Sequence, residues 1–149
     1  MSRLRSDELW KWSAAELAYG IRTRAISSRE AVTSCLNRLE QVNPKLNAIV
    51  EMTAEETLRE ADAADRAVAA MEELGPLHGV PVAIKINVDQ RGLATTDGVV
   101  AFRDNIATDD SPPVANLRKS GAVLLGRTNV PAFSLRWFSS NDLHGRTLN

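Results

Sequence analysis

Two short apolar runs separated by one helix constrain the fold of this 149-residue chain most strongly. The first run predicts a strand over residues 82–88 that contains Lys85, and the second predicts a strand over residues 123–126. Between them, Ser111 precedes two prolines, which indicates a helix start because serine caps helices and proline fits the first helical turn. We expect this helix to end near Gly121. A helix between two apolar strands is typical of a parallel sheet, so the sequence predicts an α/β fold.

The first half of the chain, residues 1–74, has the pattern of helices. Three Ser/Thr-x-x-Glu pairs have the spacing of a capping box, in which the two side chains satisfy backbone N–H groups at a helix start. The pairs are Ser13 with Glu16, Ser27 with Glu30, and Thr53 with Glu56. They predict helices over residues 14–23, 28–42 and 54–74, with a short strand over residues 46–52.

The ends of the second and third helices also have sequence signals. Asn43 and Pro44 are expected to end the second helix, because the residue before a proline avoids the helical conformation. Gly75 is expected to stop the third helix. The predicted apolar face of the third helix consists of Leu58, Ala61, Ala64, Val68 and Met71.

The chain length favours a single domain over residues 1–149. Residues 1–74 are predicted to be helical, and residues 75–149 to form strands, turns and one helix. The change at Gly75 is not a domain boundary, because residues 76–78 are too short and apolar to form a linker. We therefore expect N-terminal helices packed on a mixed or parallel sheet.

The composition excludes several classes of function. The net charge of −1 gives no electrostatic case for binding nucleic acid or a membrane surface. No apolar run approaches the ~20 residues that span a bilayer, and the N-terminus has no apolar signal region. The single cysteine, Cys35, excludes an internal disulfide framework. These features predict a cytoplasmic protein with neither nucleic-acid nor membrane partners.

Lys85 extends an apolar run, where a charged side chain needs an explanation. A lysine at such a place either reaches water along its aliphatic stem or is held in a dry site. An ordinary lysine has a pKa of about 10.4, and a neutral amine at pH 7 requires a decrease of about 3.4, which corresponds to about 4.6 kcal/mol. Burial can supply a change of this size. A dry lysine would be a general base that needs no histidine.

Four segments, in order, resemble motifs of the amidase signature family of serine hydrolases. The first resembles the family's GPLHGVPVAIKDN-type segment and reads GPLHGVPVAIKIN over residues 75–87. The others are TTDG at residues 95–98, GAVLLGRTNVP at residues 121–131 and GRTLN at residues 145–149. They resemble the family's TTxG turn, its GAVxxGKTNxP segment and its GxTxNP stretch. Several ordered motifs together identify the chain as similar to the N-terminal part of such a hydrolase, with a partial amidase signature fold.

The resemblance implies amide hydrolysis by a Ser–Ser–Lys triad in which Lys85 is the general base. In the family, the bridging serine lies in a Gly/Ser-rich signature and the nucleophile in a later glycine-rich segment, so both are expected beyond Asn149. Ser139 and Ser140 lack flanking glycines and are not assigned to that signature. The substrate would be a small-molecule amide, cleaved to a carboxylate and ammonia or an amine without a cofactor. We expect the chain alone, which stops before the signature, to be inactive.

Two departures from the family pattern matter most. Ile86 stands where the family commonly has aspartate, and Ala132 stands where it often has glutamate. The first departure removes a polar role from position 86 and leaves Lys85 itself unaffected.

Two alternatives to a hydrolase remain open. A truncated sheet leaves strands unpaired, and such edges recruit other chains, so the chain could be a non-catalytic binding or assembly module that self-associates. It could also belong to the amide-hydrolysing subunit of an amidotransferase, whose distinguishing features would lie beyond Asn149.

The remaining chemically active residues have simpler explanations. His78 is predicted to be a structural hydrogen-bonding residue, and Cys35 a core or boundary residue. His78 and His144 are too far apart in sequence for a metal site without further motif residues, so no metal is predicted. Thr128 and Asn129 lie at a strand end, where contact with a ligand and a structural role in the turn before Pro131 are equally good explanations. Trp137 is predicted to form a pocket wall in a long loop that follows Pro131.

Overall fold

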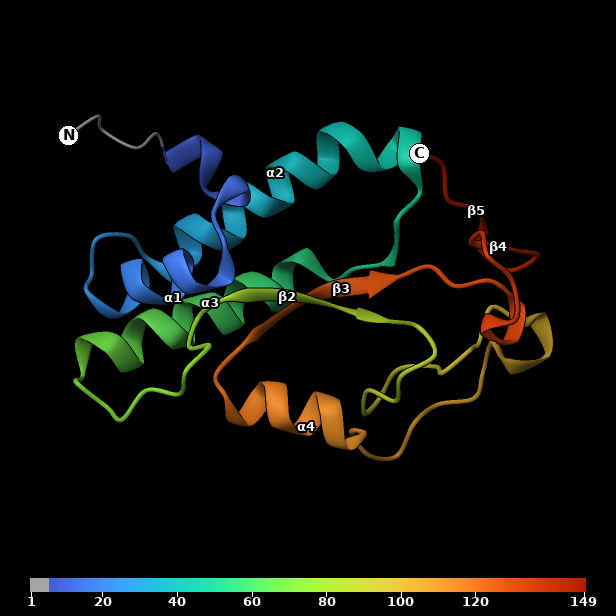
Figure 1. The fold of residues 1–149 in the computed structure, drawn as a ribbon. Coiled ribbons are helices and arrows are strands. Elements are labelled where there is room, and N and C mark those ends of the chain that lie inside the picture. The colour runs from blue at the N-terminus through green and yellow to red at the C-terminus, as the bar shows by residue number, and fades with distance from the viewer. Residues whose placement is uncertain (1–5) are drawn as a thin grey trace. The chain divides into compact units, whose positions relative to one another are not determined.

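The computed structural model describes residues 6–149, which form four α-helices, three short 3₁₀ helices and five short strands (Figure 1). In chain order these are η1 (Ser6–Lys11), α1 (Ala14–Arg22), α2 (Ser28–Leu46), β1 (Ile49–Glu51), α3 (Ala54–Ala69), β2 (Pro81–Lys85), η2 (Val100–Phe102), α4 (Pro112–Lys119), β3 (Val123–Thr128), η3 (Ala132–Ser134), β4 (Ser140–Asn141) and β5 (Gly145–Arg146).

The described residues divide into two units made of interleaved segments. The first unit comprises residues 6–41, Thr53–Val82 and Leu117–Leu125. The second unit comprises Val42–Met52, Ala83–Asn116 and Gly126–Asn149. The single-domain organisation expected from chain length stays a prediction.

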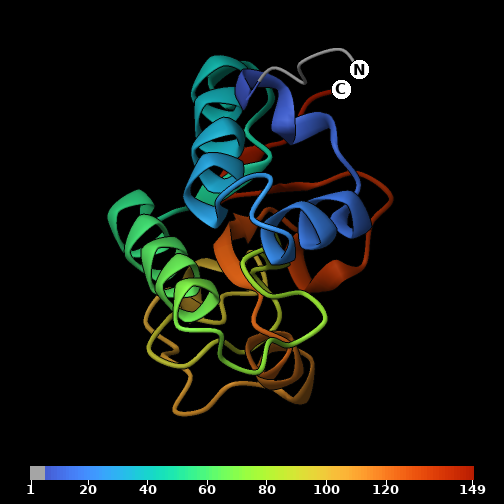
Figure 2. The same cartoon turned by 90° about the vertical axis from the view of Figure 1, so that its left-hand side faces the viewer.

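The first unit buries two clusters of apolar side chains. One cluster gathers around Ile21 of α1 and Val68 of α3, and its buried members are Leu9, Leu17, Ile21, Ala31, Val68 and Val80. The other joins Val32 of α2 to Ala61 of α3 and to Val123 and Leu125 of β3. Helices α2 (cyan) and α3 (green) therefore lie side by side, as Figure 2 shows. The alanines of α3 permit this close packing.

Two of the three predicted capping boxes are confirmed. Glu16 N–H donates to Ser13 Oγ and Ser13 N–H donates to Glu16, which is a complete box at the start of α1. The same reciprocal pair forms between Ser27 and Glu30 before α2. Thr53 makes no side-chain capping bond, so the third prediction was wrong. Its φ of −122° and ψ of 77° place it outside the usual N-cap conformation.

The predicted end of α2 before Asn43 was also wrong, since the helix continues through Pro44 to Leu46. Pro44 lies in the last turn, where its missing N–H costs one helical bond. Asn43 instead organises the helix exit, because its Oδ1 accepts bonds from Ala48 N–H and Ile49 N–H at 2.9 Å each. The strand that follows is consequently shorter than predicted and covers Ile49–Glu51.

Helix α3 ends at Ala69, before the predicted stop at Gly75. Met71 takes the left-handed conformation with a φ of 57° and is 84% exposed, so it does not extend the apolar face as predicted. Ala61, Ala64 and Val68 of that face are buried.

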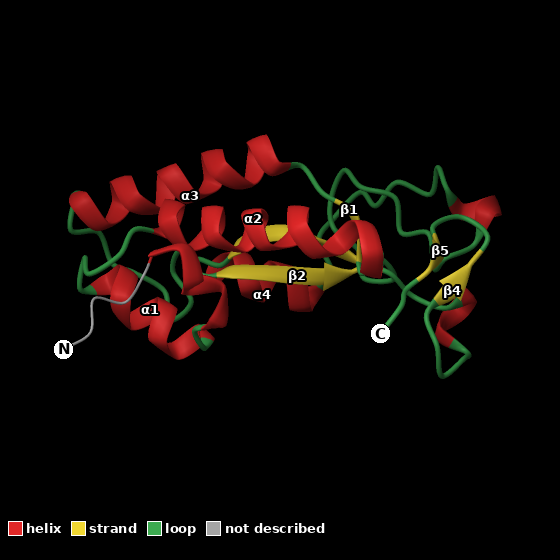
Figure 3. Ribbon diagram, turned by 90° about the horizontal axis from the view of Figure 1, so that it is seen from above, coloured by secondary structure: helices red, strands yellow, loops and turns green. Residues whose placement is uncertain are grey.

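The sheet is mixed, one of the two arrangements that the sequence analysis predicted, and has the strand order β1-β3-β2. Its two outer strands, β1 and β2, are labelled in Figure 3. Val123 N–H donates to the Val80 carbonyl, and Ile86 N–H donates to the Thr128 carbonyl. Residue numbers therefore increase in the same direction along β2 and β3, so the two strands are parallel. Strand β1 pairs antiparallel with β3, with Ile49 opposite Thr128. The order β2-α4-β3 is the predicted strand-helix-strand unit, and its α/β class is confirmed.

The second unit also contains a two-stranded antiparallel pair, β4 with β5, in place of the long loop that was predicted after Pro131. Among residues 6–149, no helix combines the length and apolar character needed to cross a membrane.

Candidate active site

Lys85 is the last residue of β2 and its side chain is exposed. Its neighbours Ile84 and Ile86 are 6% and 0% exposed. Side chains alternate between the two faces of a strand, so the buried isoleucines place Lys85 on the opposite face. The dry site considered from the sequence is therefore not formed by residues 6–149. The backbone of Lys85 is nevertheless fixed, because its carbonyl accepts a bond from Val88 N–H at 3.0 Å.

The segment after Lys85 is connected to a strained turn in the same unit. Asn87 Nδ2 donates to Ser134 Oγ at 3.1 Å, and Phe133 N–H donates to the Asp97 carbonyl at 2.9 Å. Asp97, Phe133 and Ser134 all have positive φ, at 47°, 54° and 57°. Such conformations in non-glycine residues are costly and occur often at functional sites. The parallel strand end and these turns are thus a candidate site.

A cavity of about 440 Å³ lies beside this turn within the second unit. Phe133 and Phe138 give it apolar walls, and Arg136 and Asp142 give it charged groups. Trp137 is fully exposed and does not line this cavity, so its predicted role as a pocket wall stays a prediction. In this cavity an aromatic wall comes from Phe138, the next residue.

Two buried asparagines connect the end of β3 to β4. Asn141 Nδ2 donates to Asn129 Oδ1 at 2.8 Å and to the Val130 carbonyl at 2.7 Å. Asn129 Nδ2 in turn donates to the Gly145 carbonyl and to Thr147 Oγ1, both at 3.1 Å. These bonds support a structural role for Asn129 in the turn, which is one of the two roles considered from the sequence.

Gly98 fits closely against this asparagine network. It has a φ of 66°, and a Cβ there would lie 2.9 Å from Asn141 Nδ2. Both the conformation and the contact require glycine, which gives a physical reason for the last residue of the TTDG turn.

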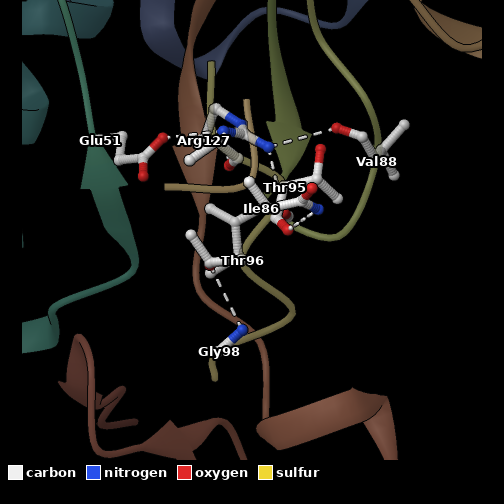
Figure 4. Close-up of polar contacts among 9 residues, drawn as sticks. Glu51, Ile86, Val88, Thr95, Thr96, Gly98 and Arg127 are labelled. Atoms are coloured by element: carbon white, nitrogen blue, oxygen red, sulfur yellow. Dashed lines mark hydrogen bonds and ion pairs between the residues drawn. The ribbon is translucent and has the colours of Figure 1, made fainter. Parts of the chain in front are cut away.

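Arg127 of β3 is the largest fully buried side chain among the described residues, with 1% exposure. Its Nη1 donates to Glu51 at 2.9 Å and to the Ala94 carbonyl at 2.7 Å. Its Nη2 donates to the carbonyls of Ile86 at 3.0 Å and Val88 at 3.2 Å (Figure 4). Sequence analysis missed this arrangement, although a charged residue inside an otherwise apolar strand was a visible signal.

The two histidines and the cysteine lie in environments that favour structural roles. His78 Nε2 donates to the Ala64 carbonyl at 2.9 Å, which confirms its predicted structural role. Desolvation lowers the pKa of His144, the Glu51 carboxylate partly opposes this change, and the Arg127 cation adds to it. Burial raises the pKa of the Cys35 thiol, so little of the reactive thiolate forms. Within residues 6–149, no three His, Cys, Asp or Glu residues gather as a metal site.

The fold is a small α/β arrangement, and comparison with known proteins identifies the family of the chain. The family model "Amidase" matches residues 30–149. The chain therefore belongs to the amidase signature family.

Individual relatives agree with this assignment. The chain is 50% identical to the indoleacetamide hydrolase of Bradyrhizobium diazoefficiens over 95% of its own length and 27% of that protein. It is 37% identical to a glutamyl-tRNA(Gln) amidotransferase subunit of Moorella thermoacetica, over 95% of the chain and 29% of that protein. Among solved structures, a fatty acid amide hydrolase matches with a TM-score of 0.91 and 29% identity, over 98% of this chain and 26% of that one. The chain thus spans little more than a quarter of the length of these relatives.

Proposed function

We propose that this chain supplies the general base of an amide hydrolase, and that Lys85 is that base. The observation that carries the proposal is the 50% identity to an indoleacetamide hydrolase over nearly the whole chain. The position of Lys85 supports it, because parallel α/β sheets bind ligands beyond the carboxyl ends of their strands. The strained turn at Phe133 and Ser134 lies in the same unit as Lys85.

The proposed chemistry is acyl transfer through two serines. The neutral Lys85 amine takes a proton from a bridging serine, which takes one from the nucleophilic serine as that oxygen attacks the amide carbon. Collapse of the tetrahedral intermediate breaks the C–N bond, and the relay returns a proton to the leaving nitrogen. Water then hydrolyses the acyl-enzyme to the carboxylate. Both serines, and the cover that would keep Lys85 dry, are expected in the part of the relatives that this chain does not span.

The substrate is proposed to be a small carboxamide, and indole-3-acetamide is the first compound to test. The name of the 50% identical relative motivates this choice. The aromatic walls of the cavity at Phe133 and Phe138 are compatible with an aryl group. A cytoplasmic location is part of the same proposal, since it rests on the composition and the single cysteine.

The amidotransferase alternative is supported by the 37% identity to the Moorella amidotransferase protein. The self-association alternative is supported by the sheet order, because β2 has a neighbour on one side only among the described strands. Light scattering of the purified chain separates self-association from the other two, since a monomer excludes it.

The test of the hydrolase proposal is a chimera in which this chain replaces the matching N-terminal portion of the Bradyrhizobium enzyme. We expect the chain alone to release no ammonia from indole-3-acetamide, and the chimera to do so. Lys85→Met keeps the length of the side chain and removes the amine, so kcat should fall by about 10²–10⁴-fold. Lys119→Met, at another exposed lysine, is the matched control and should retain activity. A folded chimera that is inactive, or one that keeps its activity in Lys85→Met, would refute the proposal.

A further inference from the structure

We infer that Arg127 is a positioning residue that fixes the backbone on which Lys85 stands, an inference that rests on the proposed role of Lys85. Three of the four hydrogen-bond acceptors of its guanidinium are main-chain carbonyls, those of Ile86, Val88 and Ala94. All three lie in the segment that begins one residue after Lys85. Arg127 therefore holds the chain at the point where β2 ends and the candidate site begins.

A contribution to stability does not readily explain why the Arg127 cation is buried at this position. A buried charge loses its hydration, and replacing a buried ion pair by apolar side chains is often neutral or stabilising. The carboxylate that pairs with Arg127 within residues 6–149 is that of Glu51, whose side chain is 31% exposed. Arg127 Nε is buried without a partner among the described residues. The guanidinium is thus costly to bury, and its remaining contacts all organise one loop.

The planar guanidinium group suits arginine better than any other residue to bind several carbonyl groups of one loop. Arginine presents five N–H donors in a fixed plane, whereas lysine has three donors on one nitrogen. In Figure 4, Arg127 reaches toward Glu51 on one side and Val88 on the other, with Ile86 between. A lysine at position 127 cannot hold all four acceptors.

The consequence for Lys85 follows from the bonds around it. Ile86 is held on both sides, because its N–H donates to Thr128 at 3.1 Å and its carbonyl accepts from Arg127. Val88 is held in the same way, by Lys85 and by Arg127. A general base must lie within about 2.6–3.2 Å of the proton it takes. A displacement of about 1 Å can cost about 10²-fold in rate.

The test compares Arg127→Lys and Arg127→Met in the chimera with Thr57→Val as a control. Thr57 is a buried residue of the first unit whose Oγ1 donates to the Leu124 carbonyl, so its loss weakens the fold without touching the Lys85 loop. We expect kcat to fall about 10-fold in Arg127→Lys and about 10²-fold in Arg127→Met, with KM within about twofold. Thr57→Val should leave kcat within about twofold.

A second measurement needs no activity and uses the chain alone. Amide hydrogen exchange of Ile86 and Val88 should accelerate about 10-fold in Arg127→Lys, while the amides of α3 keep their rates. Equal acceleration in both places, or equal loss of kcat in Thr57→Val, would overturn the inference because Arg127 would then be merely structural. Unchanged kcat in both Arg127 variants would also overturn it. If Lys85→Met remains active, the proposed function itself fails, and that result is distinguishable from the others.

Discussion

The two units of this chain differ in the polar side chains that they bury. The first unit holds both apolar clusters, around Ile21 and Val32, and its buried polar residues are the small Ser28, Ser34 and Thr57. The second unit also buries apolar side chains, but its buried polar residues are larger. They are Arg127, Asn129 and Asn141, together with two threonines. Apolar burial stabilises a fold without direction, whereas hydrogen bonds fix geometry. The comparison indicates that the apolar clusters of the first unit stabilise the fold, and that buried polar side chains fix the geometry of the second unit in addition to its own apolar burial.

The exposed apolar side chains of the two units also differ in how they are distributed along the sequence. In the second unit, Phe133, Leu135, Trp137 and Phe138 lie close together in the sequence and are all more than half exposed. In the described part of the first unit, the exposed large apolar residues are Trp10, Tyr19 and Met71, which are scattered along the sequence. The unit that contains Lys85 therefore also exposes several large apolar side chains within one short segment, residues 133–138. This arrangement agrees with a chain that spans about a quarter of its relatives.

The largest effect on stability is expected in the first unit. Ile21→Ala removes a fully buried side chain of the apolar cluster and should lower the free energy of unfolding by about 2–5 kcal/mol. Met71→Ala removes an 84% exposed side chain and should change it by less than about 0.5 kcal/mol. Urea unfolding of both variants measures the difference. A loss below about 1 kcal/mol for Ile21→Ala would contradict the assignment of stability to this unit.

A smaller loss is expected from the asparagine network of the second unit. Asn141→Leu removes the donor to Asn129 and Val130 and the acceptor that serves Leu143 and His144. Groups left buried and unpaired should cost about 2 kcal/mol. Asn149→Leu, the same substitution at an exposed position, is the control and should be neutral within about 0.5 kcal/mol. If Asn141→Leu proves as stable as the native chain, the second unit does not depend on polar positioning.

The sequence predicted the elements of the fold better than their ends, for a physical reason. The capping boxes at Ser13 and Ser27 are formed by residues three positions apart, so the local sequence is enough to predict them. The end of α2 depends on Asn43 bonding across the exit to Ile49, a contact that no propensity encodes. Likewise, the motif segments contain Lys85, but the acceptors of Arg127 come from Glu51 and from the loop after Lys85, which are far apart in the sequence. Such convergence depends on tertiary structure.

A smaller effect on stability is expected when a capping box that forms, at Ser13, is compared with one that does not, at Thr53. Ser13→Ala removes a bonded cap and should cost about 1 kcal/mol of unfolding free energy. Thr53→Ala removes a side chain that makes no capping bond and should cost less than about 0.3 kcal/mol by that mechanism. Thermal unfolding of the two variants in parallel provides the measurement. Equal losses would mean that Thr53 caps α3 in solution.

The smallest expected effect concerns the response of the second unit to pH. The folded chain lowers the pKa of His144 from 6.5, chiefly by desolvation, and its Nε2 is buried without a partner among the described residues. The unfolded chain therefore binds the proton more readily than the folded chain. The contribution of neutral His144 to stability is present above about pH 6.5 and is lost as pH falls through the lower folded pKa.

Replacing His144 with glutamine tests the direction of this pH dependence of stability, because glutamine does not titrate. The unfolding free energy of the native chain should decrease more steeply than that of His144→Gln between about pH 7 and about pH 5. Glu51→Gln removes the charge that opposes the change, so the pKa of His144 should fall further in that variant. NMR titration of the imidazole follows both effects directly. A native chain that gains stability relative to His144→Gln on acidification would show that the second unit favours the imidazolium, contrary to its desolvated environment beside Arg127.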